Sequence, residues 1–230
     1  MVSIITPTTY ARAKFMPLLV NNILSQTYPH NLLEWVIVGD ADPRTRDIYL
    51  KRFADIPTIK CKYYECDIHH NIGLKRNYGS SLATSKILAN MDDDDFYHKM
   101  YIEYSVKTMK EKNVNLTGCR DMLIFYPLVH GKIIIVRRSS VHEATLVYTK
   151  KHCDKHKYAN VHHGEGVPMI KGKYFQELNI RMVMICFAHD CNTYNKDSLV
   201  HATELKIPET MRQMLMSMSC MCRLRDEQDA

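Results

Sequence analysis

The sequence predicts an open, mostly parallel α/β sheet. Short apolar runs rich in β-branched residues alternate with amphipathic stretches through the first half of the chain, a pattern typical of strand–helix–strand units. Three of the predicted strands end in polar residues, and such residues gather at one edge of the sheet when strands run parallel. With 230 residues, 46% of them hydrophobic, the chain can bury the core of one domain.

Five strands are predicted in the first half, each ended by turn residues or by a following helix. We expect these strands at residues 2–6, 35–38, 59–64, 87–91 and 114–117. Apolar residues recur at helical spacing between them. We expect the helices around residues 15–26, 48–53, 74–83 and 97–109.

The second half predicts a smaller, antiparallel part. Two apolar runs flank His130-Gly131 and predict a hairpin. The predicted strands lie at residues 122–126, 132–136, 145–148 and 180–187, and a last helix starts at Pro208 with Met211, Leu215, Met218 and Cys222 on one face. Because we find no linker or internal repeat, we expect a single domain over residues 1–230, with a first half at 1–117 and a second at 118–230.

Composition excludes several classes of protein. No apolar stretch is long enough to cross a membrane, and the first residues lack the basic start of a secretion signal. We therefore expect a soluble, cytoplasmic protein whose eight cysteines are reduced thiols. The net charge is +6, but the lysine-rich run at 150–157 is interpreted as a solvated basic loop, so nucleic acid is not expected as a partner.

The strongest chemical signal is the run Asp92-Asp93-Asp94-Asp95, directly after the fourth predicted strand. Adjacent carboxylates repel one another by about 1 kcal/mol per close pair even in water, and a divalent cation removes that cost. Oxygen ligands select hard ions such as Mg²⁺ or Mn²⁺. A helix N-cap would explain one or two of these residues but not four.

Several segments in chain order resemble family 2 glycosyltransferases of the GT-A fold. The matching segments are residues 2–12, 25–29 followed by 34–40, 71–79, and 91–95, the last resembling the Asp-x-Asp metal signature of that family. The resemblance covers roughly residues 2–105. The compact size is also similar to that of enzymes encoded by large algal viruses. Two departures are Ala11, where the family has Asn, and Gly39, where it has Asp.

The resemblance implies a role for individual residues. Thr8 and Asp40 would contact the nucleotide base, and Arg76 and Asn77 the nucleotide and its diphosphate. Asp92 would lie near the ribose. The implied nucleotide-sugar site comprises Thr8, Tyr10, Arg12, Asp40, Arg76, Asn77, Asp92 and Asp93, with Asp94 binding the metal.

An inverting transferase also needs a carboxylate that takes the proton of the acceptor hydroxyl. The segment most similar to the family's base is 162–166, where Gly166 occupies the usual Asp position and Glu165 becomes the candidate. Asp190 and Asp154 come next. His189 follows the last predicted strand and could bind the metal or a phosphate, or be an ordinary strand-end histidine.

These observations favour a Mn²⁺- or Mg²⁺-dependent glycosyltransferase. Its donor would be a nucleoside-diphosphate sugar, most simply a UDP-sugar, and its acceptor a glycan or glycoprotein. A nucleotidyltransferase or phosphotransferase would use a similar acidic cluster, but it usually has a Gly-rich loop after the first strand, and residues 6–12 contain no Gly. A non-catalytic glycan- or nucleic-acid-binding module is the remaining alternative.

Overall fold

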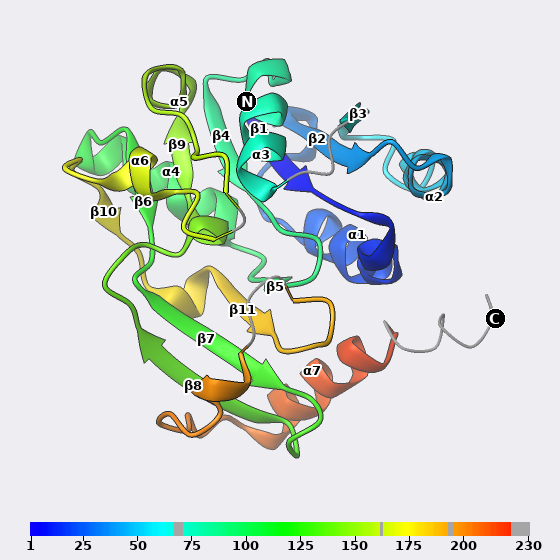
Figure 1. Ribbon diagram of the computed structural model, residues 1–230, viewed down its shortest axis with the longest axis vertical. Helices are drawn as coiled ribbons and strands as arrows, with labels where there is room; N and C mark the ends of the chain where they lie inside the picture. Colours follow the sequence, from blue (N-terminus) through cyan, green and yellow to red (C-terminus); the bar gives the residue numbers. More distant parts are fainter. Residues whose placement is uncertain (67–70, 162, 193–195, 222–230) are drawn as a thin grey trace.

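A seven-stranded sheet forms the centre of the computed structural model, which describes residues 1–66, 71–161, 163–192 and 196–221 (Figure 1). Its strand order is β10-β6-β9-β4-β1-β2-β3. The neighbours β4, β1, β2 and β3 run parallel, as predicted, whereas β9 runs antiparallel between β4 and β6. The strands are β1 (Val2–Pro7), β2 (Leu33–Asp40), β3 (Lys60–Cys66), β4 (Ile87–Asn90), β6 (Leu116–Gly118), β9 (Val147–Thr149) and β10 (Gln176–Glu177).

Helices cover both faces of this sheet because the buried side chains of its strands alternate between two faces. Ile5 of β1 and Val36 of β2 belong to one core cluster, beneath α3 (Ile72–Leu82). Ile4 and Trp35 belong to the other cluster, on the face covered by α1 (Met16–Leu24) and α2 (Pro43–Phe53). Alternation with a period of two thus produces a three-layer arrangement.

A second, four-stranded sheet packs below the first (Figure 1), with the order β5-β11-β7-β8. The predicted hairpin at His130-Gly131 is confirmed, and both turn residues have positive φ. β11 pairs parallel with β7, so this part is mixed rather than antiparallel throughout. The strands are β5 (Phe96–Tyr97), β7 (Asp121–Tyr126), β8 (Lys132–Arg137) and β11 (Met184–Phe187).

The last predicted helix is confirmed as α7 (Glu209–Met221). It lies beside the β7–β8 hairpin (Figure 1), where Arg212 donates a 2.6 Å hydrogen bond to the carbonyl of Gly131. Leu215 is fully buried, whereas Cys222 of the predicted stripe lies outside the described residues. In the part of the chain that the structure describes, no helix has both the length and the hydrophobicity needed to cross a bilayer.

Three predictions of local structure were wrong. Tyr97 belongs to β5, and α4 (Tyr101–Lys112) starts only at residue 101, because Tyr97 pairs with Met184 of β11. The segment 180–182 is a 3₁₀ turn before β11. The basic run contains a helix, α5 (Lys150–Lys155), which the Thr149 side chain caps and which buries Cys153.

The remaining short elements are η1 (Tyr10–Phe15), η2 (His30–Leu32), η3 (Glu143–Thr145), η4 (Ile180–Met182), η5 (Asp197–Leu199) and α6 (Val167–Ile170).

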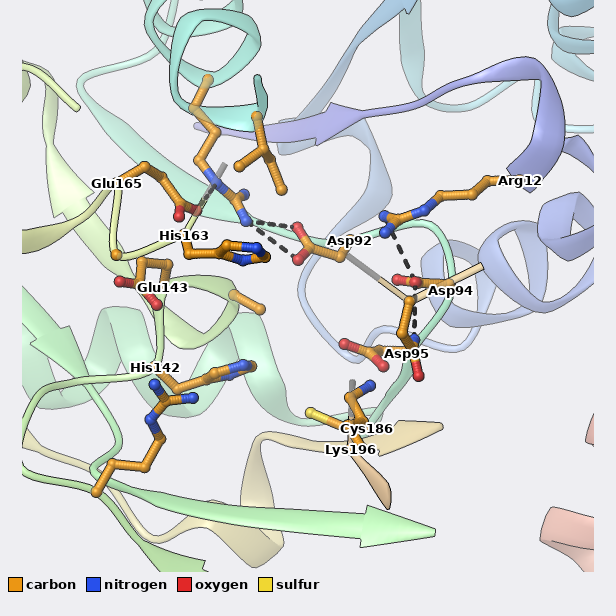
Figure 2. A pocket seen from close by; sticks show the side chains of 16 residues that line it. Arg12, Asp92, Asp94, Asp95, His142, Glu143, His163, Glu165, Cys186 and Lys196 are labelled. Atoms are coloured by element: carbon orange, nitrogen blue, oxygen red, sulfur yellow. Dashed lines mark hydrogen bonds and ion pairs between the residues drawn. The ribbon is translucent and has the colours of Figure 1, made fainter. Parts of the chain in front are cut away.

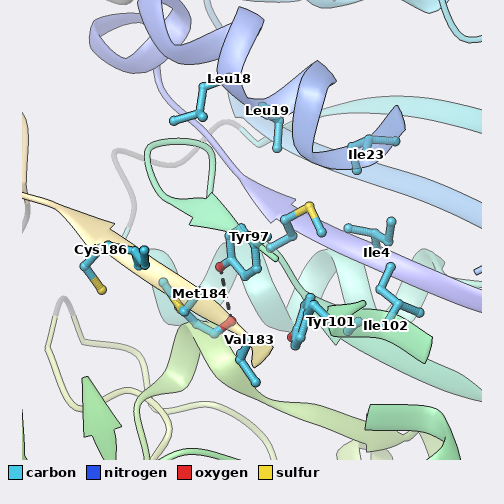
Figure 3. Packing of buried hydrophobic residues seen from close by; sticks show 14 of the residues in the cluster. Ile4, Leu18, Leu19, Ile23, Tyr97, Tyr101, Ile102, Val183, Met184 and Cys186 are labelled. Carbon is cyan, nitrogen blue, oxygen red and sulfur yellow. Dashed lines mark hydrogen bonds between the residues drawn. The ribbon is translucent and has the colours of Figure 1, made fainter. Parts of the chain in front are cut away.

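One continuous core joins the two sheets (Figure 3). Leu19 of α1 and Ile4 of β1 belong to the same buried cluster as Ile102 of α4 and Met184 of β11. Tyr97 lies in the middle of this cluster, and its hydroxyl donates to the carbonyl of Ala144 at 3.2 Å. The segment between β4 and β5 is therefore held from both sheets.

A buried carboxylate ties the other end of the parallel strands together. Glu34 of β2 is fully buried, and it accepts hydrogen bonds from the Ser3 hydroxyl at 2.5 Å and the Thr84 amide at 2.8 Å. It also forms a 2.8 Å ion pair with Lys62 of β3. Burial alone would raise the pKa of Glu34, but the bonds from Lys62, Ser3 and Thr84 outweigh it and lower the pKa to about 2.

Replacing Glu34 by Gln is expected to lower the free energy of unfolding by about 1–3 kcal/mol at pH 7, because the charged hydrogen bonds are lost. The folded-state pKa lies below the unfolded value, so this stabilisation is present above the unfolded pKa and fades as the pH falls through about 2. Urea unfolding at several pH values measures both effects. Glu111→Gln, at an exposed position of α4, is the control. Equal stabilities of wild type and E34Q at pH 7 would contradict this role.

Candidate active site at the junction of the two sheets

The four aspartates lie where the chain leaves β4 of the large sheet and enters β5 of the small one. All four are buried, with exposed fractions between 0% and 9%. The backbone of the run is fixed at its end, because Asp95 accepts from the Asn22 side chain through its carbonyl and from the Phe187 amide through its carboxylate. Four carboxylates are thus removed from water within one short segment, and each requires compensation.

Asp93 faces the loop after β1. Its carboxylate accepts a 2.6 Å hydrogen bond from the Thr8 hydroxyl and lies 3.3 Å from the Arg12 guanidinium. Burial nevertheless raises the pKa of Asp93 to about 7, with Arg12 acting in the opposite direction. Burial likewise raises the pKa of Asp95 to about 8, against the attraction of Lys196.

Asp94 faces the segment that follows β11. His189 Nε2 lies 3.1 Å from Asp94 Oδ2, and Arg12 lies 3.4 Å from the same oxygen. Burial opposes ionisation, but Arg12 and His189 outweigh it and hold the pKa of Asp94 far below its usual range. Asp94 is therefore the member of the run that stays ionised most firmly. The carboxylate of this pair is a ligand type that suits Mg²⁺ or Mn²⁺, and the imidazole is one that binds transition metals.

Asp92 and Glu165 share one buried arginine. Arg76 of α3 is 1% exposed and forms ion pairs with Asp92 at 2.9 Å and with Glu165 at 3.3 Å. Within the described residues, Arg76 Nη1 and His142 Nδ1 are buried without a hydrogen-bond partner, and Asp92 Oδ1 is paired only with Arg76. Unsatisfied buried groups are costly, and both Arg76 and His142 line one pocket, so their free nitrogen atoms are placed to receive a polar ligand.

The pocket is an open cleft with a cavity volume of about 130 Å³ (Figure 2). Asp92, Asp94, Asp95 and Arg12 form one side, and Glu165, Glu143, His142 and His163 the other. Of the residues predicted from sequence, Arg12, Arg76, Asp92, Asp94 and Glu165 line it. His189 lines a neighbouring cavity that shares Asn192 and Lys196 with the first. Asp95, the last member of the predicted acidic run, also lines the pocket. The lining residues to which sequence analysis gave no role are Ile72, Arg138, His142, Glu143, Ala144, His163, Gly164, Cys186, Asn192 and Lys196.

Asp40 is linked to this site through Lys75, which lies in the matching segment 71–79 but to which sequence analysis gave no role. Lys75 is 2% exposed, forms a 2.5 Å ion pair with Asp40 and donates to the Thr8 carbonyl at 2.6 Å. The Asp40 side chain keeps 36% of its surface exposed at the end of β2. The Gly39 departure also has a structural reason, because the Tyr63 hydroxyl occupies the space that a side chain at position 39 would need.

The other predicted site residues lie at the margin or have local partners. Tyr10 is 39% exposed, and its ring lies 3.8 Å from the Arg44 guanidinium. The Asn77 amide donates to the Tyr158 carbonyl and accepts from the Tyr158 amide, so it fixes the segment after α5. Thr8 is fully engaged with Asp93 and with the Tyr49 hydroxyl.

Asp190 and Asp154, the two alternative candidates for the base, do not line this pocket, although Asp190 lines the neighbouring cavity. Asp190 is 79% exposed and pairs with Lys14 at 3.5 Å. Asp154 on α5 is 57% exposed and pairs with Lys157 at 3.8 Å. Glu165, in contrast, is 5% exposed and lines the pocket.

The chain is an α/β protein in which buried ion pairs of acidic and basic side chains lie at the carboxyl ends of the parallel strands. A family model of glycosyl transferase family 2 matches residues 3–132, which is more than half of the 230 residues. The chain belongs to glycosyl transferase family 2. No curated protein matches the chain.

Solved structures share the GT-A fold at low sequence identity. S. aureus TarS 1–349 in complex with UDP-GlcNAc is 15% identical with a TM-score of 0.66, over 94% of this chain and 70% of that one. The same protein in complex with UDP is 17% identical with a TM-score of 0.63, over 81% and 60%. The mannosyltransferase PcManGT from Pyrobaculum calidifontis, with GDP-Man and Mn²⁺, is 16% identical with a TM-score of 0.60, over 81% and 56%. The chain thus spans 60–70% of TarS 1–349, 36% of the longer TarS structure and 56% of PcManGT.

Removing the Arg76 side chain is expected to lower the free energy of unfolding by about 3–5 kcal/mol, because Arg76→Ala leaves two buried carboxylates without their cation. The matched control is Arg52→Ala, which removes an exposed ion pair with Asp55 on the surface of α2 and should cost less than about 1 kcal/mol. Urea unfolding measures both. A change in R76A no larger than that in R52A would show that the buried pairs do not stabilise the site.

Proposed function

We propose that this chain is a metal-dependent glycosyltransferase that uses a nucleoside-diphosphate sugar, most simply a UDP-sugar. The observation that supports this best is the pocket where Arg76 keeps an unsatisfied nitrogen atom, Nη1, beside Asp92 and the ionised Asp94. A diphosphate supplies acceptors for the guanidinium, and a divalent ion satisfies the carboxylates. Fold relatives that bind UDP, UDP-GlcNAc and GDP-Man agree with such a donor.

The donor is proposed to bind along the edge of the parallel strands. Asp40 would hold the base, Asp92 the ribose, and Arg76 the diphosphate, while Thr8 would position the loop after β1 through Asp93. Lys75 pairs with Asp40 Oδ1, which neutralises the carboxylate and fixes its orientation. The remaining proposed donor residues act through these contacts: Arg12 and Asp93 fix the loop after β1, Asn77 fixes the segment at Tyr158, and Tyr10 borders the site.

Asp94 and His189 are the residues that would hold the metal, Mn²⁺ or Mg²⁺. Their facing atoms lie 3.1 Å apart, in a setting where Asp94 is strongly ionised. An ion held there would take the place of the contact between His189 Nε2 and Asp94 Oδ2. When bound, such an ion would offset the negative charge that develops on the leaving diphosphate.

The second half of the chain, from residue 118, is proposed to contribute the acceptor side. It supplies the pocket wall opposite the aspartates, including Glu165, Glu143, His142 and His163 (Figure 2). A glycan or glycoprotein hydroxyl entering between the two walls would meet a carboxylate able to take its proton, as an inverting transfer requires. Residues 1–117 would then bind the donor.

Calorimetry is expected to show that UDP binds more tightly when Mn²⁺ or Mg²⁺ is present, because an ion held by Asp94 would neutralise the charge of the diphosphate. Asp94→Ala should reduce the affinity to the metal-free value. Asp154→Ala, which removes an exposed carboxylate of α5, is the control and should bind like wild type. An affinity that is the same with excess chelator and with Mn²⁺ would refute the metal dependence.

Asp40→Ala is expected to weaken UDP binding by about 1–3 kcal/mol, the range for a hydrogen bond to a charged group. The loss should be largest for nucleotides whose base has an N–H to donate. Asp47→Ala, at an exposed position of α2, is the matched control. Circular dichroism checks that both variants fold. Equal affinities for D40A and wild type would remove Asp40 from the donor site.

A further inference from the structure

Two glutamates from distant parts of the chain face the pocket on the side opposite the aspartates (Figure 2). Glu165 lies in the loop before α6, and Glu143 begins η3. Their surroundings differ. The Glu165 carboxylate is 3.3 Å from Arg76 Nε, inside the buried ion pairs that hold α3 to the site. No side chain in the described part of the molecule forms a hydrogen bond or ion pair with the Glu143 carboxylate.

The backbone beside Glu143 is shaped around its side chain. A Cβ atom at Gly166 would lie 2.5 Å from Glu143 Cγ, which is closer than real Cβ contacts allow, and 3.2 Å from Glu143 Oε1, which is a tight contact. Gly166 therefore has to lack a side chain for Glu143 to reach the pocket. This is also the position where sequence analysis finds Gly in place of an expected Asp. The side chain of Glu143 fills the volume where that Asp would begin.

The charges around Glu143 favour a group that can exchange a proton near neutral pH. Burial and the neighbouring Glu165 raise the pKa of Glu143 to about 7, and Arg76 and Arg138 act in the opposite direction. Burial, with Lys196 and Arg138, lowers the pKa of the adjacent His142 to about 3, so that imidazole stays neutral. A general base works best when its pKa lies near the working pH.

We infer that Glu143 is the catalytic base of the transfer, and that Glu165 is a positioning residue that orients Arg76. This inference rests on the proposed glycosyl transfer. The Glu143 carboxylate takes the proton of the acceptor hydroxyl while the acceptor oxygen forms a bond to the anomeric carbon. The bond from that carbon to the diphosphate oxygen breaks, and its electron pair leaves with the nucleoside diphosphate. The carboxylic acid of Glu143 then returns its proton to solvent through the open cleft.

The test compares Glu143→Gln with Glu165→Gln in the full chain. Release of nucleoside diphosphate is followed from a panel of UDP- and GDP-sugars with Mn²⁺ and water as the acceptor, so no glycan has to be identified. E143Q should lower kcat by about 10²–10⁴-fold, the usual contribution of a general base, and leave UDP affinity within about twofold. E165Q should mainly raise KM, because Arg76 loses a partner. Glu111→Gln is the surface control.

The pH dependence separates a base from a structural glutamate. The kcat of wild type should rise with pH and level off above about 7, where Glu143 is ionised. E143Q should lose this rise, whereas E165Q should keep it. A wild-type kcat in E143Q, or an unchanged pH profile, would overturn the assignment of Glu143. If wild type binds UDP but releases nucleoside diphosphate from none of the sugars, the proposed function fails, and the role of Glu143 fails with it.

Discussion

Four consecutive buried carboxylates are the constraint on which the rest of the site depends. No single partner could compensate them, and the fold supplies cationic and hydrogen-bonding partners from several different segments. Arg76 of α3 pairs with Asp92, and Arg12 of η1 with Asp93 and Asp94. The segment after β11 adds His189 beside Asp94, and Lys196 attracts Asp95. The two sheets are therefore joined by charge compensation as well as by their common core.

Different compensation gives neighbouring aspartates different chemistry. Asp93 and Asp95 are buried with incomplete compensation, which raises the pKa of each to about 7 and 8. Asp94 lies between Arg12 and His189 and remains ionised. A run of identical residues thus becomes one strong anion between two groups that can accept a proton. Different environments push the pKa values of neighbouring carboxylates apart, so that like residues take different charge states.

The parts of the fold set by local pattern could be predicted from the sequence, and those set by distant contacts could not. β1, β2 and the acidic turn follow from apolar periodicity and strand-end residues, and the structure has them as predicted. Tyr97 was assigned to a helix because its pairing partner, Met184, lies 87 positions later (184 − 97 = 87). Lys75 and Glu143 were missed for the same reason. Their roles depend on Asp40 and Gly166, and no local spacing indicates either contact.

The antiparallel strand β9 explains how the second half of the chain reaches the site. Because β9 runs opposite to β4, its first residue lies at the edge where β4 ends, and Leu146 accepts from the Asn90 amide there. The residues just before β9 therefore lie at the carboxyl ends of the parallel strands, where ligands bind in open α/β sheets. The Asn90 side chain fixes that segment by donating to the Glu143 carbonyl at 2.7 Å. A reversal of one strand thus brings His142 and Glu143 opposite the aspartates, so that one sheet edge provides both walls of the pocket.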